Sequence, residues 1–155
     1  MRVFLAGIIQ GARTDDAIHH QGYRKEIRDV VSVAYPHAQF VDPHEENLGR
    51  LEWSRDLQRD MFLHYVTEAG LCDVLVAWLP EPSMGTSVEM YEAYRMGVPV
   101  LTISPMKGTW AVFSLATRTF PDLQKFSAFV RSPDFAELLL SPQGRASAKV
   151  GGVNE

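Results

Sequence analysis

The chain has 155 residues, of which 46% are hydrophobic and 22% are charged, and it carries a formal net charge of −4. This composition is typical of one soluble globular domain and excludes a disordered chain. The negative charge argues against binding to nucleic-acid polymers or to membrane surfaces, whereas local donors can still hold a small anion. The single cysteine, Cys72, excludes an intrachain disulfide, and without a leader-like N-terminus we expect a cytoplasmic protein.

Four apolar runs alternate with amphipathic segments up to residue 104. The first run, residues 2–9, is too short to span a bilayer and breaks at glycines, so we expect a buried strand. Residues 73–79 (DVLVAWL) are almost wholly apolar, which is typical of a strand covered on both faces of a parallel sheet. The full pattern predicts strands at 2–9, 38–41, 73–79 and 98–104, and helices at 23–35, 51–69 (ended by Gly70) and 86–96.

The last third of the chain gives weaker signals. Residues 109–118 fit either a helix or a loop, while residues 123–130 and 132–140 fit helices. The small polar residues at 141–155 predict a flexible tail, so we expect a single domain at 1–140.

Strands that alternate with helices imply parallel pairing and right-handed crossovers. The sequence therefore predicts an α/β fold, a Rossmann-like or flavodoxin-like three-layer sandwich with a mostly parallel sheet of four to five strands. In such sheets ligands bind beyond the carboxyl ends of the strands, where we place the loops 7–22, 42–50 and 80–85.

Glu89 has two interpretations. The stretch TSVE, from Thr86 to Glu89, fits a capping box, in which the glutamate only satisfies the start of a helix. Alternatively, Ala93 and Gly97 lie on the same helix face and let the helix approach closely, so that Glu89 points into the site as an ionised nucleophile. The residue pattern leaves both open.

Few other side chains show a site pattern. Ser83, Met84 and Gly85 precede a predicted helix and fit either a site for anions or sugar hydroxyls or an ordinary capped turn. Asp60 fits a surface charge or an acid near the site, and His44 is the histidine in the most favourable loop. The five histidines show no metal-binding spacing, and GxGxxG, GxxxxGK[ST] and GxSxG motifs are missing from the sequence. We therefore expect no metal and no cofactor.

Four segments resemble the nucleoside 2-deoxyribosyltransferase superfamily: FLAGIIQGAR, YRKEI, VDPHE and CDVLVAWLPEPSMGTSVEMYEAYRMGVPVL. The resemblance covers residues 2–104, and its most specific part is P-S-x-G-x-x-x-E-x-x-x-A, in which the glutamate is the family's nucleophile. It implies that Glu89 attacks the anomeric carbon of a nucleoside or nucleotide. The covalent glycosyl-enzyme is then resolved with retention, by an acceptor base in a transferase or by water in a hydrolase.

The resemblance also implies the rest of the site. Asp60 takes the place of the acid that assists the leaving base. Substrate contacts are implied for Gly7, Ile8, Gln10, Tyr23, His44, Ser83, Met84 and Gly85. A homodimer or higher homo-oligomer is implied, in which Trp110, Val112 and Phe113 either form the interface or cover the domain's own core.

Some positions depart from the family pattern. Ile8 and Gln10 stand where the family's monophosphate hydrolases carry a phosphate-binding Ser and Arg, and Phe4 replaces a Tyr. These departures favour a nucleoside or an atypical nucleotide, with Arg13 or Arg24 as the remaining cations that could reach a phosphate. Two other functions stay open: a nucleotide-sensing module without turnover, and a lysine-decarboxylase-like phosphoribohydrolase, whose usual P-G-G is P-S-M here.

Overall fold

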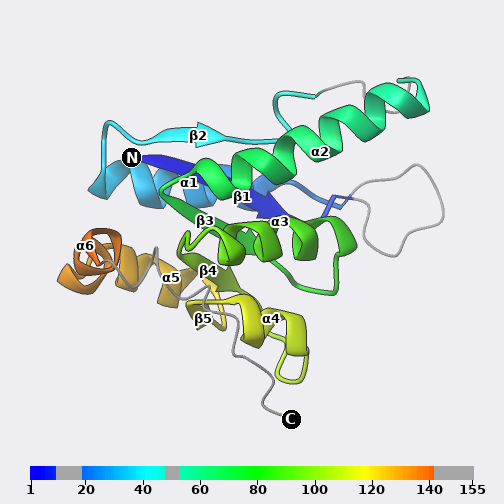
Figure 1. Cartoon of the computed structure of the whole chain (residues 1–155). Coiled ribbons are helices and arrows are strands. Elements are labelled where there is room, and N and C mark those ends of the chain that lie inside the picture. Colours follow the sequence, from blue (N-terminus) through cyan, green and yellow to red (C-terminus); the bar gives the residue numbers. More distant parts are fainter. Residues whose placement is uncertain (10–18, 48–52, 142–155) are drawn as a thin grey trace, which may run out of the picture.

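Five parallel strands form one sheet in residues 1–9, 19–47 and 53–141, the part of the chain that the computed structural model describes. The strand order is β2-β1-β3-β4-β5, and each neighbouring pair is parallel (Figure 1). The strands are β1 (Arg2–Gly7), β2 (Gln39–Val41), β3 (Val74–Trp78), β4 (Val100–Ile103) and β5 (Arg118–Phe120). The helices are α1 (Gly22–Ala34), α2 (Arg55–Leu71), α3 (Met84–Arg95), α4 (Trp110–Leu115), α5 (Leu123–Val130) and α6 (Pro133–Leu140). This confirms the predicted α/β class and its parallel sheet.

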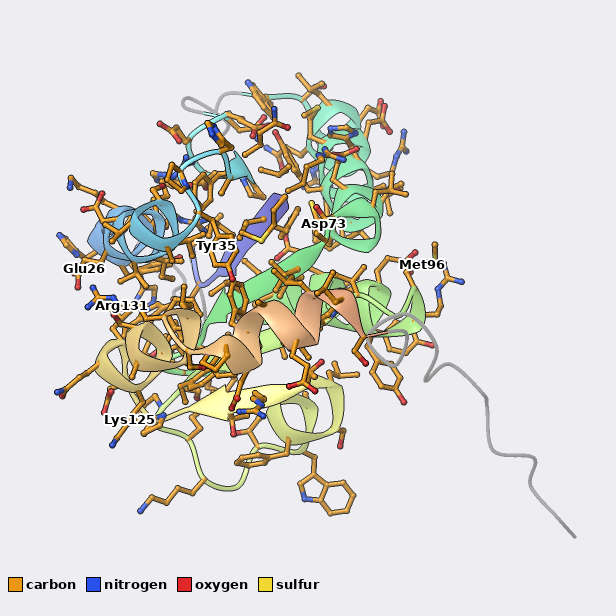
Figure 2. All side chains as sticks on the ribbon, turned by 90° about the vertical axis from the view of Figure 1, so that its left-hand side faces the viewer. Glu26, Tyr35, Asp73, Met96, Lys125 and Arg131 are labelled. Atoms are coloured by element: carbon orange, nitrogen blue, oxygen red, sulfur yellow. The ribbon has the colours of Figure 1, made fainter. Side chains whose placement is uncertain are left out.

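Two apolar clusters cover the two faces of the sheet. Successive residues of a strand point to opposite faces, so Val3 and Leu5 pack toward α1 and α5, whereas Phe4 and Ala6 pack toward α2 and α3. Figure 2 looks onto the amino-terminal ends of the strands, where Asp73 precedes β3, and shows these two helix layers on either side of the sheet. The carboxyl ends lie at the opposite end of the molecule, where a ligand site was predicted.

Helix α2 continues past the glycine that was expected to end it. Gly70 lies inside α2, and a Cβ there would come within 2.8 Å of the side chain of Met96, the residue that follows α3. The helix begins at Arg55. Ser54 is its N-cap, and the Ser54 side chain accepts a hydrogen bond from the Leu57 N–H. The prediction that Gly70 stops the helix is therefore wrong.

The segment 109–118, predicted as a helix or a loop, contains helix α4 and ends at the first residue of β5. Two residues separate α4 from β5, which pairs with β4 at the edge of the sheet. The two predicted C-terminal helices are confirmed as α5 and α6. Apart from Ser141, the predicted tail lies outside the described residues. In the part of the chain that is described, no helix is long and apolar enough to cross a membrane.

Candidate active site

A pocket of about 320 Å³ opens at the carboxyl ends of the central strands. Its walls come from the end of β1, the segment after β2, one face of α2 and the first turns of α3. The lining residues are Gly7, Ile9, Pro43, Asn47, Gln58, Met61, Phe62, Tyr65, Ser83, Met84, Gly85, Thr86 and Glu89. The pocket therefore lies at the edge of the sheet where such folds bind ligands.

Helix α3 begins at Met84 rather than at Thr86. Ser83 is the N-cap, and its Oγ accepts hydrogen bonds from the Thr86 N–H at 3.5 Å and from the Thr86 hydroxyl at 3.0 Å. Glu89 consequently lies in the second turn of the helix, too far along to satisfy the free N–H groups at its start. The capping-box interpretation of Glu89 is wrong, because Ser83 already supplies the cap.

The start of α3 offers hydrogen-bond donors to the pocket. Met84 and Gly85 are the first two helical residues, so their N–H groups have no acceptor within the helix. Together with the Ser83 hydroxyl, these groups belong to residues that line the pocket. Donors of this kind at a helix N-terminus suit sugar hydroxyls or phosphate oxygens.

Glu89 reaches the pocket from a helix face that is packed closely against the sheet, with Ala93 fully buried one turn further on. Its carboxyl group accepts no hydrogen bond from the described part of the chain. The residue is partly exposed toward the pocket, but the loss of water around the carboxyl group raises its pKa from 4.5 to about 8. The Arg24 guanidinium opposes this rise, and the Asp42 carboxylate adds to it.

A buried ion pair supports the end of β1. Arg24 is 4% exposed and Asp42 is 2% exposed, and the Arg24 Nη1 lies 2.8 Å from the Asp42 Oδ1. The same nitrogen donates to the Leu5 carbonyl at 2.8 Å, and Arg28 approaches the other Asp42 oxygen at 3.1 Å. Because Arg24 is fully engaged by protein groups, it is not the phosphate-binding cation that the sequence allowed.

Gly7 makes room for a tyrosine beneath the end of β1. The Tyr23 ring stacks on Trp78 with ring centroids 5.5 Å apart, and its hydroxyl lies 3.3 Å from the Ile8 carbonyl oxygen. A Cβ at Gly7 would come within 2.4 Å of that hydroxyl. Burial raises the pKa of Tyr23 to about 12, so its hydroxyl stays protonated.

Replacing Gly7 with alanine is expected to lower the melting temperature by several degrees. The stacked Tyr23 ring cannot move away without losing its contact with Trp78, and overpacking of this kind costs about 1–3 kcal/mol. For a chain of this length each kcal/mol corresponds to roughly 2–4 °C. Scanning calorimetry measures the shift, and the double variant Gly7→Ala/Tyr23→Phe should recover part of it. An unchanged melting temperature in Gly7→Ala would show that the Tyr23 ring can move to make room for the added methyl group.

The structure brings part of the predicted site together. The predicted residues that line the pocket are Gly7, Ser83, Met84, Gly85 and Glu89. Ile8 and Tyr23 instead line a second pocket, on the side of the sheet that α1 and α5 cover. Neither residue therefore lines the pocket that contains Glu89.

Three further predicted residues are not placed in the pocket. The Asp60 side chain is 64% exposed on α2 and pairs with Arg59, and the residue is not part of the pocket wall. His44 does not line the pocket either, and its backbone N–H donates to Asp42. Gln10 lies outside the described residues.

Sequence analysis missed the wall that α2 and the segment before it provide. The described residues of that wall are Pro43, Asn47, Gln58, Met61, Phe62 and Tyr65. The signal that could have revealed the helical part is spacing, because Gln58, Met61 and Tyr65 recur every three to four residues and share one face of α2. The spacing alone does not say whether that face covers the core or a ligand.

Comparisons with known proteins agree with this architecture. No family model matches the chain. Over 158 residues it is 28% identical to the 5-hydroxymethyl-dUMP N-hydrolase of Mus musculus, across 94% of this chain and 85% of that protein. A 2-deoxyribosyltransferase of Bacillus psychrosaccharolyticus shares the fold, with a TM-score of 0.65 at 18% identity over 89% of this chain and 96% of that one. A CMP N-glycosidase of Clostridium botulinum aligns over 83% of this chain and 96% of that one, with 16% identity and a TM-score of 0.49.

Proposed function

We propose that this chain is a member of the nucleoside 2-deoxyribosyltransferase superfamily and that it cleaves the N-glycosidic bond of a 2′-deoxynucleoside or its 5′-monophosphate. Its sequence motif, its fold and its similarity to the mouse hydrolase support this proposal. The observation that carries the proposal is the Glu89 carboxyl group. It lines the pocket at the carboxyl edge of the sheet, and no hydrogen bond from a described residue occupies it. Such a group is free to act as a nucleophile once it is ionised.

The proposed reaction is a double displacement at the anomeric carbon. An oxygen of Glu89 forms a bond to C1′ while the C1′–N bond breaks and its electron pair leaves with the base. Water or an acceptor base then attacks C1′ from the vacated side, which releases Glu89 and retains the configuration. The donors at the start of α3 hold oxygens of the sugar or phosphate, and the apolar face of Met61 and Phe62 borders the base.

The described wall of the pocket offers no cationic side chain to a 5′-phosphate. None of its described lining residues is a lysine or an arginine, and Arg24 is bound to Asp42. Arg13 lies outside the described residues. The name of the mouse relative favours a monophosphate. Both forms therefore belong in the assay.

The direct test incubates the protein with 5-hydroxymethyl-2′-deoxyuridine and with its 5′-monophosphate, each with and without added adenine as acceptor. Liquid chromatography then measures the free base and any new nucleoside. Base release in water alone identifies a hydrolase, and a new adenine nucleoside identifies a transferase. If neither substrate releases base, the proposed activity on this substrate class is wrong.

One observation favours a non-catalytic alternative. With a pKa of about 8, Glu89 is protonated in most molecules of the free protein at neutral pH. A protonated carboxyl group is a poor nucleophile. A nucleotide-sensing module would use the same pocket without turnover. Calorimetric binding of either probe without base release would favour this alternative.

We also propose that the protein forms a homodimer through exposed residues of α3 and α4. Tyr91 on α3 and Trp110 on α4 are 55% and 86% exposed, and the proposal joins them in one apolar interaction surface. Of the predicted interface residues Phe113 is also exposed, whereas Val112 is buried in the protein's own core.

Replacing Tyr91 with glutamate is therefore expected to dissociate the dimer, because it puts a charge on a surface that must lose water when the dimer forms. Sedimentation velocity at micromolar concentration measures the change. A wild-type protein that sediments as a monomer would contradict the proposal.

A further inference from the structure

The proposed reaction needs a group that stabilises the departing base. When the C1′–N bond breaks, the base takes the electron pair and becomes anionic unless a donor approaches it. Asp60, the acid expected from the sequence, is exposed and paired with Arg59 outside the pocket wall. We therefore looked for another donor among the described residues of the pocket wall.

Two of the described lining residues have ionisable side chains, Glu89 on α3 and Tyr65 on α2. Glu89 is assigned to the sugar, and the Ser83 and Thr86 hydroxyls lie at the start of α3, where the sugar or phosphate is placed. The Asn47 amide already donates to Pro43 and Tyr65, and the Gln58 amide donates to the Trp53 carbonyl. We therefore consider Tyr65 for the base. We propose, on the basis of the proposed function, that the Tyr65 hydroxyl donates a hydrogen bond to a ring nitrogen or carbonyl oxygen of the leaving base. Tyr65 would then stabilise the negative charge that develops on the leaving base.

Two neighbours fix the position of the Tyr65 hydroxyl. Its oxygen accepts a hydrogen bond from the Asn47 side-chain amide at 2.7 Å, and its O–H donates to the Glu46 carboxylate at 2.9 Å. Asn47 is itself held, since its amide also donates to the Pro43 carbonyl at 2.7 Å. The phenol oxygen therefore sits in a constrained place while its proton can rotate.

When a ligand binds, the Tyr65 O–H can leave Glu46 for the leaving base without leaving a polar group unsatisfied. Glu46 is exposed and also accepts from the Asp42 N–H at 3.0 Å, so it can take hydrogen bonds from water when the phenol turns away. The Tyr65 O–H then points at the base, and the phenol oxygen keeps the hydrogen bond from Asn47. No proton leaves the protein in this step, and the departing base takes its proton from solvent.

The surroundings of Tyr65 keep its hydroxyl protonated, so that it can act as a hydrogen-bond donor and not as a proton acceptor. Tyr65 is 6% exposed, and burial, assisted by the Glu46 carboxylate, raises its pKa to about 12. The hydroxyl is therefore protonated throughout the neutral range. A neutral donor fixed in a partly dry pocket stabilises charge that develops on the leaving group without having to reorganise.

Tyr65→Phe removes the hydroxyl and keeps the ring. On 2′-deoxyuridine we expect kcat to fall about 10²-fold, the scale for one lost donor, with KM nearly unchanged. On 5-fluoro-2′-deoxyuridine the loss should be several-fold smaller, because fluorine already stabilises the departing anion. Tyr94→Phe, at an exposed tyrosine of α3 that does not line the pocket, is the matched control and should lose nothing.

The outcomes separate this role from a structural one and from the proposed function. An unchanged kcat in Tyr65→Phe, or an equal loss on both substrates, overturns the role of Tyr65 alone. No base release by the wild-type protein overturns the proposed function as well. If Tyr65→Phe does not fold, Tyr65→3-fluorotyrosine keeps the ring and supplies a stronger donor that is still protonated. It should raise kcat on 2′-deoxyuridine, and an unchanged kcat would overturn the proposal.

Discussion

Replacing Glu89 with glutamine is expected to reduce base release by about 10⁴-fold or more, the scale on which enzymes lose activity when their nucleophile is removed. The amide has nearly the same volume as the carboxyl group but cannot form the glycosyl ester, so the loss is chemical and not steric. Release of free base from 5-hydroxymethyl-2′-deoxyuridine and its 5′-monophosphate is the measurement. Turnover at the wild-type rate would exclude Glu89 as the nucleophile.

The stability of the same variant gives a second readout. The pKa of Glu89 rises from 4.5 to about 8 on folding, so between these values the unfolded chain releases a proton that the folded protein keeps. This contribution to stability is fully present below pH 4.5 and is lost as the pH rises toward 8. Glu89→Gln lacks this dependence, and its melting temperature should rise relative to wild type between pH 5 and pH 8.

Glu92→Gln is the matched control on the same helix. Glu92 pairs with Arg95 on the outside of α3 and does not line the pocket. Its replacement should leave base release unchanged. If both glutamine variants lose activity to the same extent, the effect comes from α3 in general and not from the Glu89 carboxylate.

Replacing Asp42 with asparagine should have the largest effect on stability. It leaves the Arg24 charge buried with only neutral partners, and the loss of one member of a buried pair costs about 3–5 kcal/mol. For a chain of this size the melting temperature should fall on the order of 10 °C. Base release at a temperature where the variant is folded should survive in part, because Asp42 does not line the pocket.

A solvent-exposed pair in α1 provides the control for that prediction. Lys25 and Asp29 lie 2.6 Å apart with both side chains mostly exposed, and such pairs contribute less than about 1 kcal/mol. Asp29→Asn should therefore melt within about 2–4 °C of wild type. An equally small shift for Asp42→Asn would show that water reaches the Arg24–Asp42 pair.

The fold class and the position of Glu89 could be predicted because they depend on local patterns. A fully apolar run such as residues 73–79 has few alternatives to a central parallel strand, and the following helix must start at the ligand edge. The detailed start of that helix could not be settled in the same way. Thr86 and Ser83 are both good caps, and the closer fit of Ser83 depends on the path of the whole turn.

The rest of the site depends on tertiary packing. Gly70 was predicted to break α2, but it lies inside the helix at a close contact with Met96 and Glu92. The packing of α2 leaves Tyr65 in the pocket wall and Asp60 exposed. The edge strand β5 has three residues, too few for a periodic pattern to identify it. Contacts between distant segments thus determine the features that the sequence did not reveal.

Trapping the covalent intermediate tests the central claim most directly. In a 2′-deoxy-2′-fluoroarabino nucleoside the fluorine slows both displacements. When its base is a good leaving group, the first displacement stays faster than the second, and the glycosyl-enzyme accumulates. Intact-mass and peptide mass spectrometry then locate the added sugar. The double-displacement mechanism predicts one fluorosugar on the peptide that contains Glu89 and none on the Glu89→Gln variant. A sugar or nucleoside product with inverted configuration at C1′, or a sugar attached to a different residue, would contradict it.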